Sequence, residues 1–234
     1  MKILVLGNGF DLAHYLPTKY SQFLEFVRML KAKDEELFPD DSFHRQLLDL
    51  ISRLGCGTDH TAKEAQAITA NENKLLDHFL KVYNERCKQG KTGWIDFEAE
   101  IADIIKTFDE AIEFSKSAVE RGKTQYRHPK AMLEKLAPFI YARSNIEYEI
   151  VEDHTYSPDF LKEKADLRLQ ELNELTRLFE IYLTEFVEQY PTEYRIPEIY
   201  KLRHSIDAVL SFNYTDTYRR LYCDAENVDC CFIH

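Results

Sequence analysis

The chain opens with a short apolar run that leads into two glycines, and these residue types in this order could bind a phosphate group. Residues 3–6 are Ile, Leu, Val and Leu, and Gly7 and Gly9 bracket Asn8 directly after them. A buried parallel strand that ends in a Gly-x-Gly turn brings the backbone close to a pyrophosphate, and the N–H groups of the next helix start attract negative charge. The third glycine of a G-x-G-x-x-G fingerprint would stand at position 12, where the chain has Leu12. A structural strand-to-helix turn is the alternative.

Asp11 follows this turn and fits a phosphate site poorly, because a carboxylate repels phosphates. We expect it to accept a hydrogen bond from a ribose hydroxyl or to cap the helix.

A second polar cluster follows an apolar run near the other end of the chain. Residues 206–212 form that run, and Asn213, Tyr214, Thr215 and Asp216 come next. Ligands of open α/β sheets bind at the carboxyl ends of the strands, so these side chains are candidates for ligand contact. An Asx-type cap for the helix that follows is the alternative.

A third strand is predicted over residues 228–233, and His234 follows it. If the three predicted strands are parallel neighbours, the glycine turn, the Asn213 cluster and His234 converge on one cleft. Convergence of polar groups at one edge is stronger evidence for a site than any of these groups alone.

Composition excludes several classes of function. A formal net charge of −11 disfavours nucleic acid, and no run of Lys and Arg offers a local exception. The five cysteines include no C-x-x-C pair, which predicts reduced thiols in a cytoplasmic protein. We expect no signal peptide and no membrane span, because no apolar run approaches the ~20 residues required. The histidines show no H-x-x-x-H or H-E-x-x-H pairing, so no metal site is predicted.

Helical periodicity dominates the residues between the first and second predicted strands. We expect helices from about residue 18 to 30, from 43 to 54, from 61 to 88, from 97 to 121 and from 158 to 190, and a short one over 217–222. Residues 146–150 alternate in a strand-like pattern. The sequence thus predicts a helix-rich α/β protein with a Rossmann-like parallel sheet. Its core would comprise residues 1–30 and 205–234, and residues 31–204 would form a large helical insertion or cap.

These segments resemble the AbiH family of bacteriophage abortive infection proteins. The opening from Gly7 to His14, followed by residues 16–20, is similar to that family's opening motif almost word for word. Residues 94–98, 211–216 and 232–234 resemble its mid-chain Trp–acidic segment and its closing pair of motifs. The resemblance implies an antiviral defence function and spans nearly the whole chain.

The AbiH family is in turn similar to sirtuin-like NAD-binding proteins, with a glycine turn, a Pro-containing loop, an Asn motif and a strand that ends in His. That likeness implies NAD as substrate or ligand. The catalytic residues would be His234, as general base, with Asn213 and Asp216. The NAD-binding residues would be Gly7, Asn8, Gly9, Phe10, Asp11, Pro17, Thr18, Tyr20 and Thr215.

Two positions depart from these patterns. AbiH-like sequences usually have glycine where this chain has Tyr15, which predicts a stiffer loop beside the ligand. Sirtuin-like proteins favour Asp two residues after the Asn, where this chain has Thr215, with Asp216 one residue later.

We therefore predict an NAD glycohydrolase in which Asn213 orients the ribose or a water molecule and His234 removes a proton. Asp216 or Asp11 would support the positive charge that develops on the ribose. The alternative is a non-catalytic nucleotide-sensing or interaction module of a defence system, including a truncated inactive form, since family sequences usually continue past the final His. The sequence leaves open whether the partner is a second copy of this chain, in a homo-oligomer, or a phage-derived trigger.

Overall fold

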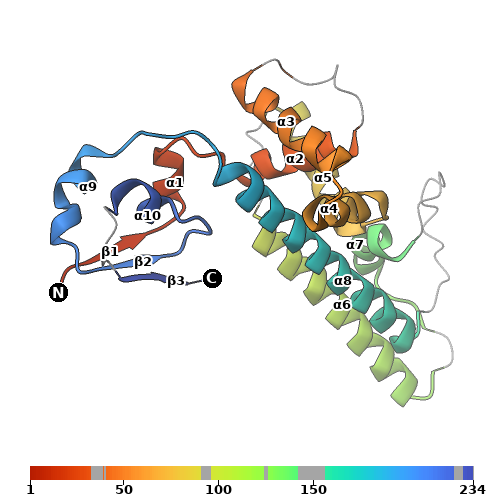
Figure 1. Ribbon diagram of the computed structural model, residues 1–234. Helices are drawn as coiled ribbons and strands as arrows, with labels where there is room; N and C mark the ends of the chain where they lie inside the picture. The colour runs from red at the N-terminus through yellow and green to blue at the C-terminus, as the bar shows by residue number, and fades with distance from the viewer. Residues whose placement is uncertain are drawn as a thin grey trace. The chain divides into compact units, whose positions relative to one another are not determined.

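The computed structural model describes residues 1–32, 39, 41–90, 96–123, 126–141, 156–223 and 229–233 (Figure 1). The chain divides into two compact units, one of Met1–Asn71 with Arg177–His234 and the other of Glu72–Thr176. The predicted strand over residues 146–150 and Trp94 lie outside the described residues. The predicted boundaries of the helical insertion, residues 31–204, stay a prediction.

A parallel sheet of three strands forms one part of the first unit. The strands are β1 (Ile3–Leu6), β2 (Ala208–Ser211) and β3 (Asp229–Phe232), and β2 lies in the middle. Short helices accompany the strands: α1 (Gly9–Ala13), α9 (Pro197–Leu202), the 3-10 turn η3 (Arg203–Ser205) and α10 (Thr217–Tyr222). The prediction of a helix-rich α/β protein with a parallel sheet is confirmed.

Side chains of β1, β2, α1 and α10 form the core on one face of the sheet. Its buried members are Leu6, Phe10, Val209, Tyr218, Leu221 and Tyr222. Ile3 and Val5 point to the other face and are 51% and 60% exposed. The apolar start of the chain predicted a strand buried on both faces, which is typical of parallel sheets. In the structure, the described residues cover only one face of the sheet.

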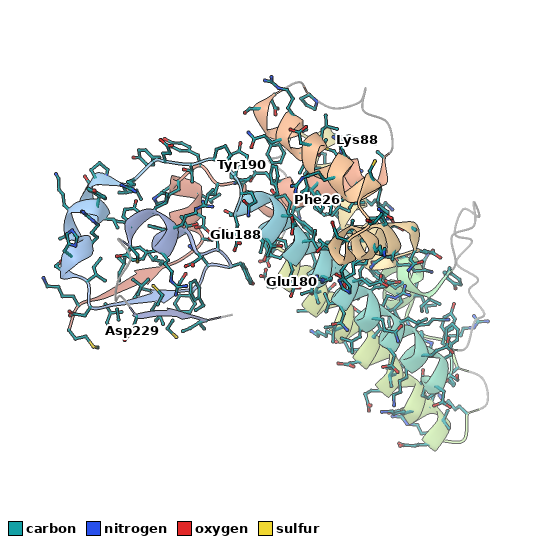
Figure 2. All side chains as sticks on the ribbon, in the orientation of Figure 1. Phe26, Lys88, Glu180, Glu188, Tyr190 and Asp229 are labelled. Carbon is teal, nitrogen blue, oxygen red and sulfur yellow. The ribbon has the colours of Figure 1, made fainter. Side chains whose placement is uncertain are left out.

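Helices make up the rest of the first unit. They are α2 (Tyr20–Lys31), α3 (Ser42–Cys56), α4 (His60–Ala70), the last turns of α8 (Pro158–Tyr182) from Arg177 on, and the π-helical turn η2 (Leu183–Val187). Phe26 of α2, labelled in Figure 2, is fully buried and packs 5.4 Å from the ring of Tyr182. Pro17 is buried just before α2, and its carbonyl accepts a hydrogen bond of 2.7 Å from the Tyr182 hydroxyl.

The second unit consists of helices: α5 (Lys74–Lys88), α6 (Phe97–Glu120), α7 (Lys130–Ile140) and α8 (Pro158–Tyr182) up to Thr176. One helix was predicted over residues 61–88, and this was wrong, because α4 ends at Ala70 and α5 begins at Lys74. Asn73 separates the two helices: its side chain accepts a hydrogen bond of 2.8 Å from the Leu76 N–H and so caps α5.

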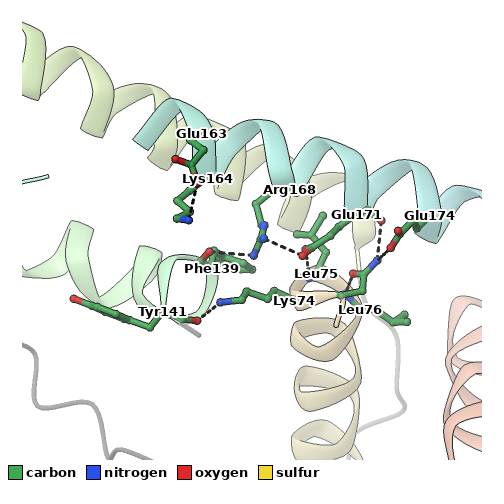
Figure 3. A network of polar contacts seen from close by, with 11 residues as sticks. Lys74, Leu75, Leu76, Phe139, Tyr141, Glu163, Lys164, Arg168, Glu171 and Glu174 are labelled. Atoms are coloured by element: carbon green, nitrogen blue, oxygen red, sulfur yellow. Dashed lines mark hydrogen bonds and ion pairs between the residues drawn. The ribbon is translucent and has the colours of Figure 1, made fainter. Parts of the chain in front are cut away.

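A buried network of charges joins the middle of α8 to the end of α7 and the start of α5 (Figure 3). Arg168 of α8 donates to the carbonyl of Phe139 at the end of α7, over 3.0 Å, and pairs with Glu171, over 2.9 Å. Glu171 in turn accepts from the Leu75 N–H at the start of α5, over 3.1 Å. A cation at a helix carboxyl end and an anion at a helix amino end both match the helix dipoles, so the network fixes how α5, α7 and α8 meet.

Candidate functional site

The carboxyl ends of all three strands lie at one edge of the sheet. Leu6 is in register with Ser211, and Ser211 with Phe232. The pairing continues past the strands, because the Phe212 N–H donates to the Leu6 carbonyl and the Ile233 N–H to the Ser211 carbonyl, each over 2.9 Å. The predicted parallel arrangement is confirmed, and the glycine turn and the Asn213 cluster follow neighbouring strands at the same edge.

His234, the predicted general base, lies outside the described residues. Ile233 precedes it and is the last described residue. The catalytic role of His234 therefore stays a prediction.

The glycine turn is exposed and open on its outer side. Gly7, Asn8 and Gly9 are all exposed, and a Cβ atom built on either glycine would meet no atom within 4 Å. The Phe10 N–H already donates to the Gly7 carbonyl over 2.8 Å, so that helix-start donor is engaged within the turn. Free space beside the backbone is what a close approach by a phosphate requires.

The Pro-containing loop contacts the turn through Thr18. Its hydroxyl donates a hydrogen bond of 3.2 Å to the side-chain oxygen of Asn8. Pro17 is tied to Tyr182 as described above, and the ring of Tyr20 packs 5.8 Å from that of Phe179. These two residues anchor the loop on α8, and Thr18 joins the loop to the glycine turn.

Tyr15 precedes this loop and adopts a left-handed backbone conformation, with φ at 61°. That conformation costs a residue with a side chain about 1–2 kcal/mol, whereas glycine adopts it freely. The ring of Tyr15 packs 5.5 Å from that of Tyr194, which helps to hold the strained residue in place. The stiffness expected of this loop stays a prediction.

Phe10 and His14 belong to the core beneath the turn. The Phe10 ring lies 4.4 Å from that of His14, and His14 is fully buried. His14 donates from Nδ1 to the Phe10 carbonyl over 2.6 Å and accepts at Nε2 from the Tyr222 hydroxyl, also over 2.6 Å. The same hydroxyl accepts from the Ile196 N–H over 2.6 Å. Every ring nitrogen of His14 thus has a structural partner, so this histidine braces α1 against α10.

Asp11 joins α1 to the turn after β2. It is 1% exposed, and its Oδ2 accepts a hydrogen bond of 2.6 Å from the Thr215 hydroxyl. Its Oδ1 has no hydrogen-bond partner among the described residues. Burial raises the pKa of Asp11, while hydrogen bonds from Thr215 and Thr217 oppose that rise. Asp11 therefore has a structural role, and at 1% exposure its carboxylate is not accessible to a ribose in this structure.

Asn213 lies at the centre of this edge and is 3% exposed. Its backbone N–H donates to the Ser211 hydroxyl over 3.2 Å, which shapes the turn after β2. Its side-chain oxygen has no donor within the described part of the chain. A buried acceptor without a donor costs about 1–3 kcal/mol, so this oxygen is a candidate acceptor for a hydroxyl group of a ligand.

A hollow of about 320 Å³ lies beside these residues. It is lined by Val187, Glu188, Gln189, Thr215, Asp216, Thr217, Arg219 and Arg220. Two predicted site residues, Thr215 and Asp216, therefore line this hollow, while the glycine turn is not part of its lining. Asp216 accepts from Arg219 over 3.1 Å, an ion pair that neutralises the predicted catalytic carboxylate.

Arg219 and Arg220 were missed by the sequence reasoning. Their spacing could have indicated them, because residues three and four positions after Asp216 lie on the same side as Asp216 of a helix that begins there.

No group of His, Cys, Asp and Glu within the described ranges could hold a metal ion. Nor is any helix in those ranges long and apolar enough to cross a membrane.

Comparison with known proteins matches this chain to one family model. The model is described as bacteriophage abortive infection AbiH, and it matches residues 3–234. No curated protein matches the chain, and no solved structure does.

Proposed function

Since the chain belongs to the AbiH family of bacteriophage abortive infection proteins, we propose that it acts in phage defence by binding NAD and hydrolysing the nicotinamide–ribose bond. The proposal rests on the shared register of Leu6, Ser211 and Phe232, because ligands of open parallel sheets bind at the carboxyl edge of the strands. A Rossmann-like sheet of the sirtuin-like type is part of the same proposal, and the parallel three-stranded sheet is compatible with it.

Two features of the edge fit a dinucleotide. The open space beside Gly7 and Gly9 would admit a phosphate to the backbone, and Thr18 holds Asn8 in place next to it. The side-chain oxygen of Asn213 lacks a donor among the described residues, which a ribose hydroxyl would supply once the site opens slightly.

The chemistry follows from glycoside cleavage, because the bond from ribose to nicotinamide breaks through an oxocarbenium-like transition state. Asn213 would orient the ribose hydroxyls or the attacking water. His234 would take the proton from that water, since an imidazole suits general-base work near neutral pH. Asp216 would support the positive charge on the ribose if a bound substrate draws Arg219 away from it.

The test is to incubate the purified protein with NAD and measure nicotinamide release. We expect His234→Ala to lower the rate about 100- to 10,000-fold, the usual effect of losing a positioned base, and Asn213→Ala to lower it as well. The exposed residues His204 and Asn71 offer matched controls, and His204→Ala and Asn71→Ala should keep the wild-type rate. Unchanged turnover in both site variants would reject these roles.

A second candidate function is nucleotide sensing without hydrolysis. It is favoured by the engagement of both acidic residues, Asp11 with Thr215 and Asp216 with Arg219. Each carboxylate thus has one oxygen committed to a structural contact, which limits its assistance to bond cleavage. This function predicts that NAD raises the melting temperature of the protein while no nicotinamide is released.

A further inference from the structure

The hollow beside Thr215 contains two consecutive arginines, Arg219 and Arg220 of α10. The formal net charge of the chain is −11, so the molecule as a whole repels anions. Two guanidinium groups in one concave surface nevertheless offer hydrogen-bond donors to an anion at the edge where the proposed nucleotide site lies.

Most hydrogen-bond donors of the pair are not used within the described part of the molecule. Arg219 gives one terminal nitrogen to Asp216 over 3.1 Å, and Arg220 gives one to the Glu188 carbonyl. A guanidinium has five N–H donors in a planar fork, so both side chains keep donors for a ligand. The guanidinium of Arg219 also lies 5.8 Å from the ring of Phe232, which places it near the end of β3.

The lining also indicates how an anion would be recognised. Asp216 and Glu188 share the hollow with the two arginines, so their formal charges balance. Recognition must then depend on directed hydrogen bonds more than on net charge. Phosphate oxygens accept paired hydrogen bonds from guanidinium groups, and a diphosphate offers enough oxygens for two arginines.

We propose that Arg219 and Arg220 in this hollow bind the diphosphate group of a nucleotide from one side, that the backbone of the glycine turn approaches it from the other, and that the two arginines determine the specificity for it. The hydrogen bond from Thr215 of the hollow to Asp11, two residues past Gly9, links the two parts of this site. The inference rests on the proposed function and deepens it. The turn that carries Asn213 also carries Thr215, so the diphosphate and the ribose of one ligand would occupy neighbouring places along the same segment.

Binding of ADP-ribose, adenosine and inorganic pyrophosphate to the full chain, measured by calorimetry, tests this proposal. Wild-type protein should bind ADP-ribose at least about tenfold more tightly than either of the other two. Arg220→Gln and Arg219→Gln should each weaken ADP-ribose binding by about 10- to 100-fold and leave adenosine binding unchanged, because each removes charge-assisted hydrogen bonds. Arg195 contacts Tyr200 instead, so Arg195→Gln is the matched control.

Because Arg219 is exposed, Arg219→Gln removes only a surface ion pair and should not disturb folding. Thermal melting would verify that this variant is folded. Equal ADP-ribose affinity in wild type and both arginine variants would overturn the proposal, as would absence of ADP-ribose binding. Pyrophosphate binding as tight as that of ADP-ribose would overturn the assignment to a nucleotide. If ADP-ribose binding depends on the arginines but wild-type protein releases no nicotinamide from NAD, only the proposed hydrolysis is rejected. If the protein releases nicotinamide and neither arginine variant changes that rate, only the proposed diphosphate site is rejected.

Discussion

The hydroxyl of Thr215 donates a hydrogen bond of 2.6 Å to the carboxylate of Asp11, across 204 positions of sequence. Both residues are buried, at 4% and 1% exposure. The contact joins α1, which follows the glycine turn, to the turn after β2, so the two halves of the candidate site hold each other in place. A buried carboxylate depends on such donors, because it has lost its contact with water.

Thr215→Val removes this donor while keeping nearly the same shape. We expect the free energy of unfolding to fall by about 1–3 kcal/mol, the usual cost of a buried acceptor left without its partner. Urea denaturation followed by circular dichroism would measure the change. Thr215→Ser keeps the hydroxyl and should cost less, so equal losses in the two variants would contradict the role of the hydrogen bond.

Asp11→Asn should change how stability depends on pH. Burial raises the pKa of Asp11 in the folded state above the unfolded value of 3.8. As the pH rises past 3.8, the unfolded chain loses this proton first, so the carboxyl lowers wild-type stability until the folded form ionises too. The amide of the variant cannot titrate. The stability of the variant relative to wild type should therefore increase with pH above 3.8, and a constant difference over that range would contradict the raised pKa.

Gly9→Ala separates a structural role of the glycine turn from a binding role. A methyl group there would meet no atom within 4 Å, so we expect the free energy of unfolding to change by less than about 0.5 kcal/mol. If a pyrophosphate approaches this backbone, the methyl group would occupy its space and weaken NAD binding by about tenfold. Gly55 of α3 also has open space around it, so Gly55→Ala is the control that should leave NAD binding intact.

Local patterns in the sequence predicted the elements around the site well. The helix predicted over residues 217–222 is α10, with the same bounds, and Ser157 and Pro158 mark the start of α8 as expected. The three strands were predicted to lie in parallel, and they do. Helix starts depend on residues that are neighbours in the sequence, and strand directions follow general rules of chain connection, so both can be predicted from a single sequence.

Contacts distant in sequence could not be predicted in this way. The break between α4 and α5 depends on Asn73, whose side chain also donates to the Glu171 carbonyl, 98 positions away. The exposure of Ile3 and Val5 depends on which face of the sheet the rest of the chain covers. A helix over 130–140 was not predicted. Pro138 lies inside it and lacks the N–H that would donate to the carbonyl of Glu134, so this segment departs from the usual helical pattern.

The buried pair of Arg168 and Glu171 should be strongly coupled. Arg168→Leu leaves the Glu171 carboxylate buried without its cation, and we expect a loss of about 3–5 kcal/mol in the free energy of unfolding. Glu171→Leu should cost a similar amount, and the double variant should cost clearly less than the sum of both. The exposed pair of Lys116 and Glu113 is the control, and Lys116→Ala should cost less than about 1 kcal/mol. Additive losses at the buried pair would show that the two charges do not depend on each other.

His128 should make the protein less stable in mild acid. Its ring is buried in the second unit, where Nε2 lies 2.9 Å from the Ser115 hydroxyl, and burial lowers the pKa of His128 from 6.5. Below pH 6.5 the unfolded chain therefore binds a proton that the folded chain does not, so stability is complete above this pH and is lost as the pH falls. His128→Gln keeps a donor for Ser115 but cannot titrate, so its melting temperature should fall less than that of wild type when the pH is lowered from neutral into mild acid. Because burial lowers the pKa of His78 as well, His78→Gln should reduce the remaining pH dependence further. Equal pH dependence in wild type and His128→Gln would contradict the account.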